Sequence, residues 1–182
     1  MSLRDGTRAV NGLDGPENSL PGGGLRAGAS RYALLPLRLF LSVTFIYAGV
    51  DKLTDPAFLA DSGNGSLAQL LESARDAAAI PAMIDLALND PRSFGIAIAA
   101  GELAVGLGTL FGLWTRLAAF GGALISLSLW LTVSWSSSPY YYGNDLPYLM
   151  AWTPLILAGA PMLSLDRAIT SRRRRKGRHI FG

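Results

Sequence analysis

The chain has 182 residues, half of them hydrophobic and only 16 % charged. That length usually forms one domain, and so low a charge content is unusual for a soluble protein. The chain has no cysteine and one histidine, His179, so its own side chains cannot form disulfides, iron–sulfur clusters or thiol redox relays. A structural metal needs several ligands in one place, which a single histidine cannot supply. We therefore expect no metal site.

The basic residues are segregated at the two ends of the chain. Four of the 16 Lys and Arg residues lie in the first 31 positions and seven in the last 17. The formal net charge of +3 is compatible with nucleic acid, but these residues flank apolar segments instead of covering a folded face. The pattern favours a lipid bilayer as the partner and argues against nucleic acid.

The first segment, residues 1–31, contains seven Gly and two Pro without apolar periodicity. Such a composition buries too little surface to order itself, so we expect a disordered cytoplasmic tail. A cleaved signal peptide is the alternative. However, the first apolar segment begins only after residue 31 and exceeds the roughly 7–15 residues of a signal peptide's apolar region.

Four apolar segments follow, at residues 32–53, 94–113, 117–135 and 146–165. As helices rising about 1.5 Å per residue, each can cross a hydrocarbon core of about 30 Å. Only Trp114, Thr115 and Arg116 separate the second from the third, which predicts a tight antiparallel hairpin. The sequence thus predicts an all-α fold, an integral membrane four-helix bundle within residues 32–166, followed by a basic cytoplasmic tail at 167–182.

Positive charge gives the expected orientation. The N-terminal tail, Arg116 and the C-terminal tail carry the basic residues, and four crossings place all three on one side, the cytoplasmic side. The basic run 172–176 is expected to set this topology and to bind anionic lipid, with binding of a cytoplasmic partner as the alternative. Both termini are therefore predicted to be cytoplasmic, in a prokaryotic plasma membrane.

The long segment 54–93 is predicted to lie outside and to contain its own helices. Ser66 and Gln69 form a capping-box pattern, and Leu67, Leu70 and Leu71 follow at helical spacing. Pro81 then interrupts the pattern. We expect one or two short amphipathic helices on the outer membrane surface that cover the mouth of the bundle. The alternative is a loop helix with no role beyond closure.

Four charged residues fall within the predicted spans, where a charge is costly and needs a partner or a purpose. Asp51 and Lys52 are near the outer end of the first helix. Arg38 lies roughly 9 Å from the cytoplasmic start of that helix, and Glu102 roughly 12 Å from the outer start of the second. Extended side chains could bridge most of the remaining gap, so the sequence allows a direct or water-bridged pair of Arg38 with Glu102 but does not decide whether a direct pair forms.

Helical spacing places these residues on inward faces. One stripe of the first helix contains Arg38, Ser42, Phe45, Gly49 and Lys52. On the second helix, small residues surround the acid and allow close approach of a neighbour. This second stripe comprises Gly95, Ala99, Glu102, Gly106 and Thr109.

Two interpretations of the inward charges stay open. One is a structural ion pair that sets helix register. The other is a polar pocket that binds a ligand head group or moves a proton. The candidate pocket residues are Arg38, Lys52, Glu102, Tyr47 and Asp51.

A second candidate site lies at the outer face, before and within the fourth apolar segment. Its residues are Asn144, Asp145, Tyr148 and Trp152. The aromatic residues are typical of an interfacial belt. Asn144 or Asp145 is expected to cap the fourth helix and complement its dipole, and contact with a quinone or substrate is the second interpretation.

Three ordered pieces of sequence resemble the DoxX superfamily, and more closely its DoxD branch, the small membrane subunit of thiosulfate:quinone oxidoreductase. The first is Arg38 with residues 45–53 (FIYAGVDKL) and Asp55-Pro56. The second is Gly101-Glu102-Leu103 through residues 112–117, and the third is residues 142–146 through Pro161. Together they span residues 32–166, and the long segment before the second helix also resembles DoxD.

The resemblance implies a membrane subunit of a quinone-linked oxidoreductase, working with a partner subunit. No cofactor is expected to be bound covalently, and the chain has no redox centre of its own, so any electrons belong to the partner or to a quinone. A quinone is the expected ligand, in an apolar slot with one or two polar groups. The alternative is a non-enzymatic accessory or assembly subunit of a respiratory or cell-envelope complex. A small-molecule carrier is third, because no internal repeat is evident.

Overall fold

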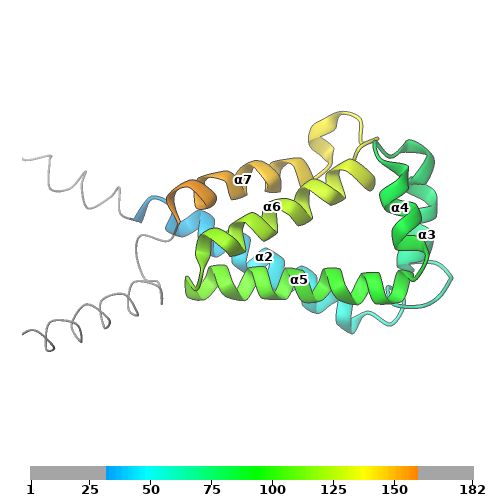
Figure 1. The fold of residues 1–182 in the computed structure, drawn as a ribbon, viewed down its shortest axis with the longest axis horizontal. Helices are drawn as coiled ribbons and strands as arrows, with labels where there is room; N and C mark the ends of the chain where they lie inside the picture. Colours follow the sequence, from blue (N-terminus) through cyan, green and yellow to red (C-terminus); the bar gives the residue numbers. More distant parts are fainter. Residues whose placement is uncertain (1–31, 160–182) are drawn as a thin grey trace, which may run out of the picture.

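The computed structural model describes residues 32–159, and these residues form helices and connecting loops without strands (Figure 1). The predicted tails and residues 160–166 lie outside the described part. Four long helices are α2 (Leu35–Thr54), α5 (Pro91–Phe111), α6 (Thr115–Thr132) and α7 (Asp145–Ala158). The shorter elements are α3 (Leu67–Ala74), η1 (Arg75–Ala77), α4 (Pro81–Leu88) and η2 (Tyr140–Tyr142). The prediction of an all-α chain is confirmed for the described residues.

Helix α5 begins three residues before the predicted start because a local cap, and not the apolar pattern, determines its first turn. The Asp90 carboxylate accepts a hydrogen bond from the Ser93 amide at 3.1 Å, and Pro91 occupies the first turn. An Asp at the N-cap followed by Pro at the first helical position is a strong helix start. The Asp90-Pro91 pair was the sequence signal for this boundary.

The predicted hairpin between α5 and α6 is present, and its turn depends on two left-handed residues. Gly112 ends α5 with φ of 66°, and Trp114 precedes α6 with φ of 48°. The Leu113 amide donates to the Gly108 carbonyl at 2.9 Å, which is the hydrogen bond that defines a Schellman motif at a helix C-terminus. Glycine is the residue that enters this region without steric cost.

The long helices pack chiefly as two pairs, α2 along α5 and α6 along α7. Small residues permit the first contact, because a Cβ on Gly49 would lie 2.7 Å from the Ala99 carbonyl oxygen. In the second pair, a Cβ on Gly122 would lie 2.3 Å from the Trp152 ring. The predicted inward stripes are confirmed, since Arg38, Ser42, Phe45 and Gly49 on α2 and all five stripe residues on α5 are buried.

Helices α5 and α6 diverge as they leave the hairpin, and α3 and α4 lie across the opposite end (Figure 1). Ser66 caps α3 by accepting from the Gln69 amide at 3.2 Å, and Gln69 Oε1 accepts from the Gly65 amide. The predicted short helices are therefore confirmed. Pro81, however, starts α4 instead of merely interrupting a pattern. Helices α3 and α4 together form what we call the α3–α4 cap. The Ala79 amide, between η1 and α4, donates to the Leu131 carbonyl at 2.9 Å, which ties the α3–α4 cap to the end of α6.

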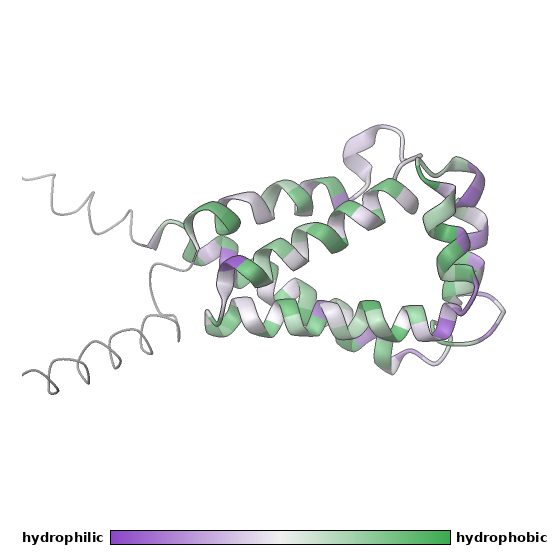
Figure 2. Cartoon of the chain, viewed as in Figure 1, coloured by the Kyte–Doolittle hydropathy of each residue, from purple (hydrophilic) through white to green (hydrophobic). Residues whose placement is uncertain are grey.

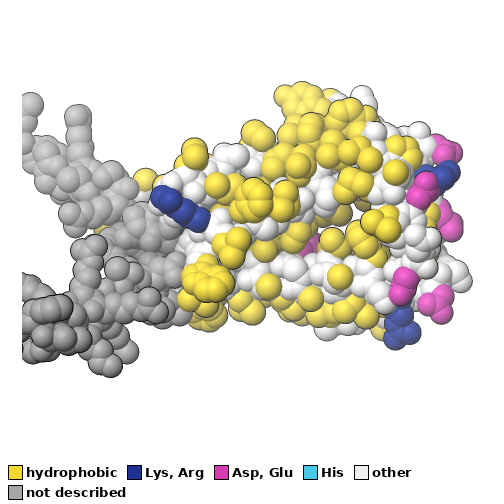
Figure 3. Space-filling view, viewed as in Figure 1, with side chains coloured by type: hydrophobic (Ala, Val, Ile, Leu, Met, Phe, Trp, Pro, Cys, Tyr) yellow, Lys and Arg dark blue, Asp and Glu magenta, His cyan; other side chains and the backbone are white. Residues whose placement is uncertain are grey.

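The outward side chains of the long helices are largely apolar, whereas charges gather on α3, α4 and their loops (Figures 2 and 3). Large hydrophobic side chains exposed on the long helices include Val43, Tyr47, Leu107, Phe120, Leu124 and Leu157. Helices α5 and α6 are each long and apolar enough to cross a membrane. Helices α2 and α7 do not meet the same criteria within the described residues, because α2 carries three charged residues and α7 has 14 residues there.

Candidate functional site

The central feature of the candidate site is an ion pair between α2 and α5. Lys52 Nζ lies 2.9 Å from both carboxylate oxygens of Glu102. The Glu102 side chain is 4 % exposed and that of Lys52 is 22 % exposed, so the acid is sealed and the ammonium is partly accessible. A third, longer contact of 3.5 Å joins Lys52 Nζ to the Ala48 carbonyl. All three ammonium protons thus have an acceptor.

Glu102 pairs directly with Lys52 and not with Arg38. Gly49 packs against Ala99 and Leu103, so Glu102 lies level with the turn of α2 around Gly49. Eleven residues of helix separate Gly49 from Arg38, which is roughly 16 Å along the axis, too far for the two side chains to meet. Arg38 instead donates from Nη2 to the Leu110 carbonyl at 3.2 Å, in the last turn of α5, where a cation complements the helix dipole.

Asp145 turns toward the interior instead of capping α7. Asn144 occupies the N-cap position and Asp145 is an acid in the first turn, as predicted, but the Asn144 side chain makes no capping hydrogen bond. The Asp145 carboxylate accepts a hydrogen bond from the Ser134 hydroxyl. The structure therefore pairs Lys52 with Glu102, while the carboxylate of Asp145 is bound by Ser134 in the loop after α6.

The other predicted site residues are scattered. Tyr47 is 71 % exposed on the outward face of α2, and Asp51 and Asn144 are also exposed. Trp152 is fully buried and stacks edge-on against Phe45, with ring centroids 4.9 Å apart. Tyr148 is half-buried against the same Phe45 ring. The two aromatic residues therefore belong to the core between α2 and α7, and not to an exposed outer site.

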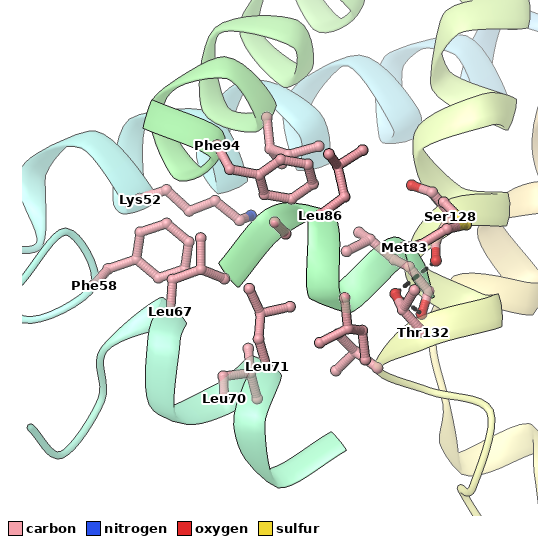
Figure 4. Close-up of a pocket in the computed structure, with 15 residues that line it drawn as sticks. Lys52, Phe58, Leu67, Leu70, Leu71, Met83, Leu86, Phe94, Ser128 and Thr132 are labelled. Atoms are coloured by element: carbon pink, nitrogen blue, oxygen red, sulfur yellow. Dashed lines mark hydrogen bonds between the residues drawn. The ribbon is translucent and has the colours of Figure 1, made fainter. Parts of the chain in front are cut away.

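A cavity of about 140 Å³ lies between the α3–α4 cap and the diverging ends of α5 and α6. Its walls are apolar, and Phe58, Leu71, Ile84 and Phe94 are among them. In Figure 4 the Lys52 ammonium enters between Phe58 and Phe94, with Ser128 and Thr132 on the far side. Lys52 is the charged member of this lining, so it faces both Glu102 and the cavity.

The two hydroxyl groups in the cavity wall are already committed as donors. Ser128 Oγ donates to the Ile125 carbonyl at 2.8 Å, and Thr132 Oγ1 donates to the Ser128 carbonyl at 2.7 Å. Their oxygens retain accepting capacity. The cavity therefore offers one cationic donor at one side and two hydroxyl oxygens at the other.

Sequence reasoning did not find this cavity, although part of its signal was present. The amphipathic pattern of 67–74 predicted a helix with an apolar face, and that face, with Leu67 and Leu71, now lines the cavity. The pattern could not show that α5 and α6 would diverge and leave space beneath it.

Comparisons with known proteins give a family match but no individual relative. Comparison with curated protein sequences finds no match, and comparison with solved structures also finds none. The DoxX family model matches residues 33–135, which include α2 through α6 and both partners of the Lys52–Glu102 pair. Because this match covers more than half of the 182 residues, the chain belongs to the DoxX family.

Proposed function

We propose that this DoxX-family chain is a DoxD-like membrane subunit of a quinone-linked oxidoreductase, of the thiosulfate:quinone type, which anchors a partner subunit and shapes the quinone site. The observation that carries the proposal is the apolar cavity with the Lys52 ammonium in its wall. A quinone site needs an apolar slot and a donor for a carbonyl oxygen. Electrons come from the partner, because this chain has no cysteine for a redox centre.

The size of the cavity supports a ligand with one six-membered ring. An engineered apolar cavity of about 150 Å³ in another protein holds benzene, and this cavity has about 140 Å³. The longer contact from Lys52 to the Ala48 carbonyl is the one most easily exchanged for a ligand oxygen, since hydrogen bonds of this length are weak. Lys52 can then bind a ring carbonyl while its two hydrogen bonds to Glu102 remain in place.

The proposal includes a four-helix membrane bundle with both termini cytoplasmic, in a prokaryotic plasma membrane. Its support is the apolar outward surface, which Figure 3 shows over α5, α6 and α7. The exposed large hydrophobic side chains of α2, such as Val43 and Tyr47, extend it to that helix. The start of α2, the α5–α6 hairpin and the end of α7 also lie at one end of the molecule (Figure 1). Arg116 is at that end, and positive charge favours the cytoplasmic side.

Two variants of α4 test the ligand site. Ala87 is buried and lines the cavity, whereas Ala82 is exposed on the same helix. We expect Ala87→Leu to fill the cavity and to abolish photolabelling of the purified protein by an azido-benzoquinone, while Ala82→Leu leaves labelling intact. Excess ubiquinone-1 should compete. Equal labelling of both variants, or labels only outside the cavity, would contradict the site.

The enzymatic role is tested in membranes from a strain that lacks the gene. Thiosulfate-dependent quinone reduction should fall and be restored by the wild-type chain and by Ala82→Leu, but not by Ala87→Leu. An unchanged rate in the deletion strain would exclude the oxidoreductase role.

A second function, that of a non-enzymatic accessory or assembly subunit, is favoured by the completeness of the ion pair. Both Glu102 oxygens are bound by Lys52, which is how a purely structural pair satisfies a buried acid. Under this function, loss of the protein would lower the amount of an associated membrane complex without a ligand-dependent effect. Purification of the tagged chain in mild detergent, with and without the Lys52→Met substitution, measures that association.

A further inference from the structure

The polar groups of the cavity differ in hydrogen-bonding character from one side to the other. Lys52, Ser128 and Thr132 are the polar side chains among the residues that line it. The Lys52 ammonium enters on one side, and the two hydroxyl-bearing side chains of α6 lie across from it (Figure 4). An ammonium group only donates hydrogen bonds. A bound ring therefore meets a donor at one end and hydroxyl oxygens at the other.

Helix α6 itself makes both hydroxyls into acceptors. The Ser128 proton goes to the Ile125 carbonyl at 2.8 Å and the Thr132 proton to the Ser128 carbonyl at 2.7 Å, which is the usual length of a strong hydroxyl bond. A hydroxyl has one proton, so each oxygen presents lone pairs to the cavity. Among residues 32–159, no side chain donates to either oxygen. Turning either proton toward a ligand would break a bond that is already formed.

The two oxidation states of a quinone respond differently to such a cavity. In the oxidised form both ring oxygens are carbonyls, which only accept hydrogen bonds, whereas each hydroxyl of the reduced form both accepts and donates. Either form can accept a bond from Lys52. At the α6 side, however, only a hydroxyl can donate to Ser128 or Thr132. A carbonyl there would face lone pairs and lose the bonds that it makes with water, and an unmade bond of a buried polar group is costly.

We propose that the cavity binds the reduced, quinol form of its ligand more tightly than the quinone form. One ring hydroxyl accepts from Lys52, and the other donates to Ser128 or Thr132. The inference rests on the proposed function and names the oxidation state that its site prefers. Tighter binding of the reduced form raises the midpoint potential of the bound ring, by about 30 mV for each tenfold preference in a two-electron couple. The bound quinone is therefore a better electron acceptor than the free one.

Redox-inert rings test this preference, because a quinol would exchange electrons with the azido-benzoquinone label. Like a quinol, 4-methoxyphenol has an accepting oxygen at one end and a hydroxyl donor at the other. The similarly sized 4-fluoroanisole lacks the donor. Both are used as competitors of photolabelling of the full-length protein, at free concentrations corrected for partition into the detergent. We expect 4-methoxyphenol to compete at a concentration about fivefold lower, a ratio within the range of one net hydrogen bond.

Variants of α6 assign the preference to its hydroxyls. The double variant Ser128→Ala/Thr132→Val removes both acceptors and should bring the ratio to about one. Ser126→Ala is the matched control, because Ser126 is a buried hydroxyl residue of α6 outside the cavity wall, and it should keep the wild-type ratio. Equal competition by the two rings on the wild type, or an unchanged ratio in the double variant, would overturn the proposal. If the double variant fails to fold, at least one of the two single variants must lower the ratio.

Thermal unfolding in the presence of each ring separates this inference from the proposed function, because it does not use the label. A ligand that binds the folded state raises Tm in proportion to its affinity and concentration. Suppose that no label enters the cavity, but 4-methoxyphenol raises Tm more than 4-fluoroanisole does and the double variant loses that difference. The donor-selective site then stands and the quinone site fails. If the label enters the cavity but the two rings do not differ in either assay, the quinone site stands and this inference fails.

Discussion

The two ends of the molecule both place basic side chains inside or against the helices, but they use them differently. At the hairpin end, Arg38 and Arg116 donate to Leu110 and Leu157, carbonyls in the last turns of α5 and α7. At the α3–α4 end, Lys52 binds a buried carboxylate and borders a cavity. The first arrangement satisfies helix ends and aids stability. The second leaves an accessible ammonium, which is a feature of a binding site.

This difference shows that burial alone does not distinguish a charged side chain that binds a ligand from one that stabilises the fold. Arg38 is as buried as Glu102, yet its guanidinium donates to a backbone carbonyl at a helix terminus. Lys52 is less buried than either, but it binds the Glu102 carboxylate and borders an apolar cavity. The composition of the surroundings, and not burial, makes Lys52 the better candidate for ligand binding.

The largest expected effect comes from breaking the Lys52–Glu102 ion pair at the α3–α4 end. Lys52→Met leaves the sealed Glu102 without its cation and should lower the free energy of unfolding by about 3 kcal/mol, as for other buried pairs that lose one partner. The double variant Lys52→Met/Glu102→Gln should recover part of this loss. Equilibrium unfolding in mixed micelles measures both. Strictly additive losses would show that the two side chains are not coupled.

The close approach of α2 to α5 is the next most sensitive feature. Gly49→Ala places a Cβ 2.7 Å from the Ala99 carbonyl oxygen and 2.8 Å from Leu103 Cγ, so the helices must separate beside the ion pair. We expect a loss of about 1–3 kcal/mol in the free energy of unfolding. Gly101→Ala is the control, since its Cβ would meet Ile125 at an ordinary 3.4 Å. An equal loss in both variants would show that helix packing is not the cause.

The hairpin end should respond to substitution in stability but not in ligand binding. Arg38→Met removes a buried donor from the end of α5 and should cost about 1.5 kcal/mol in unfolding free energy, as for a hydrogen bond to a charged group. Arg116→Met, which alters an exposed side chain, should cost less, about 0.5 kcal/mol. Quinone photolabelling should be unchanged in both. Loss of labelling in folded Arg38→Met would place that residue in the ligand site.

The smallest effect is expected on the surface of the cap, where Arg75 is bound by both oxygens of Asp85. The hydrogen bond from Arg75 holds the pKa of Asp85 below its ordinary value and raises the pKa of Arg75. A carboxyl with a lowered folded-state pKa stabilises the fold above its unfolded pKa of about 3.9. That contribution is lost as the pH falls through the folded-state value.

Hydrogen exchange of the α4 amides, corrected for intrinsic rates, measures this effect between neutral and acidic pH. We expect a modest fall in protection in the wild type below the ordinary pKa of Asp85. Asp85→Asn should show the lower protection throughout, because it cannot form the ion pair. A wild-type fall that persists unchanged in Asp85→Asn would assign it to another acid.

Several features followed from local sequence alone. The helical segments, the tight hairpin, the Ser66 cap and the inward stripes on α2 and α5 depend on contacts within a few residues or on a period of 3.6, and the structure contains them. The Asp90 start of α5 was also readable in principle, because an Asp-Pro helix start is local chemistry.

The site was decided by tertiary structure. Helix periodicity names the face on which Arg38, Lys52 and Glu102 lie, but the partner of Glu102 depends on how α2 slides along α5. The contact of Gly49 with Ala99 determined that register and selected Lys52. Asp145 makes no capping hydrogen bond because Ser134, in the loop after α6, holds its carboxylate. The cavity depends on the divergence of α5 and α6 beneath the cap, and such an angle is determined by packing between helices, which no single segment encodes.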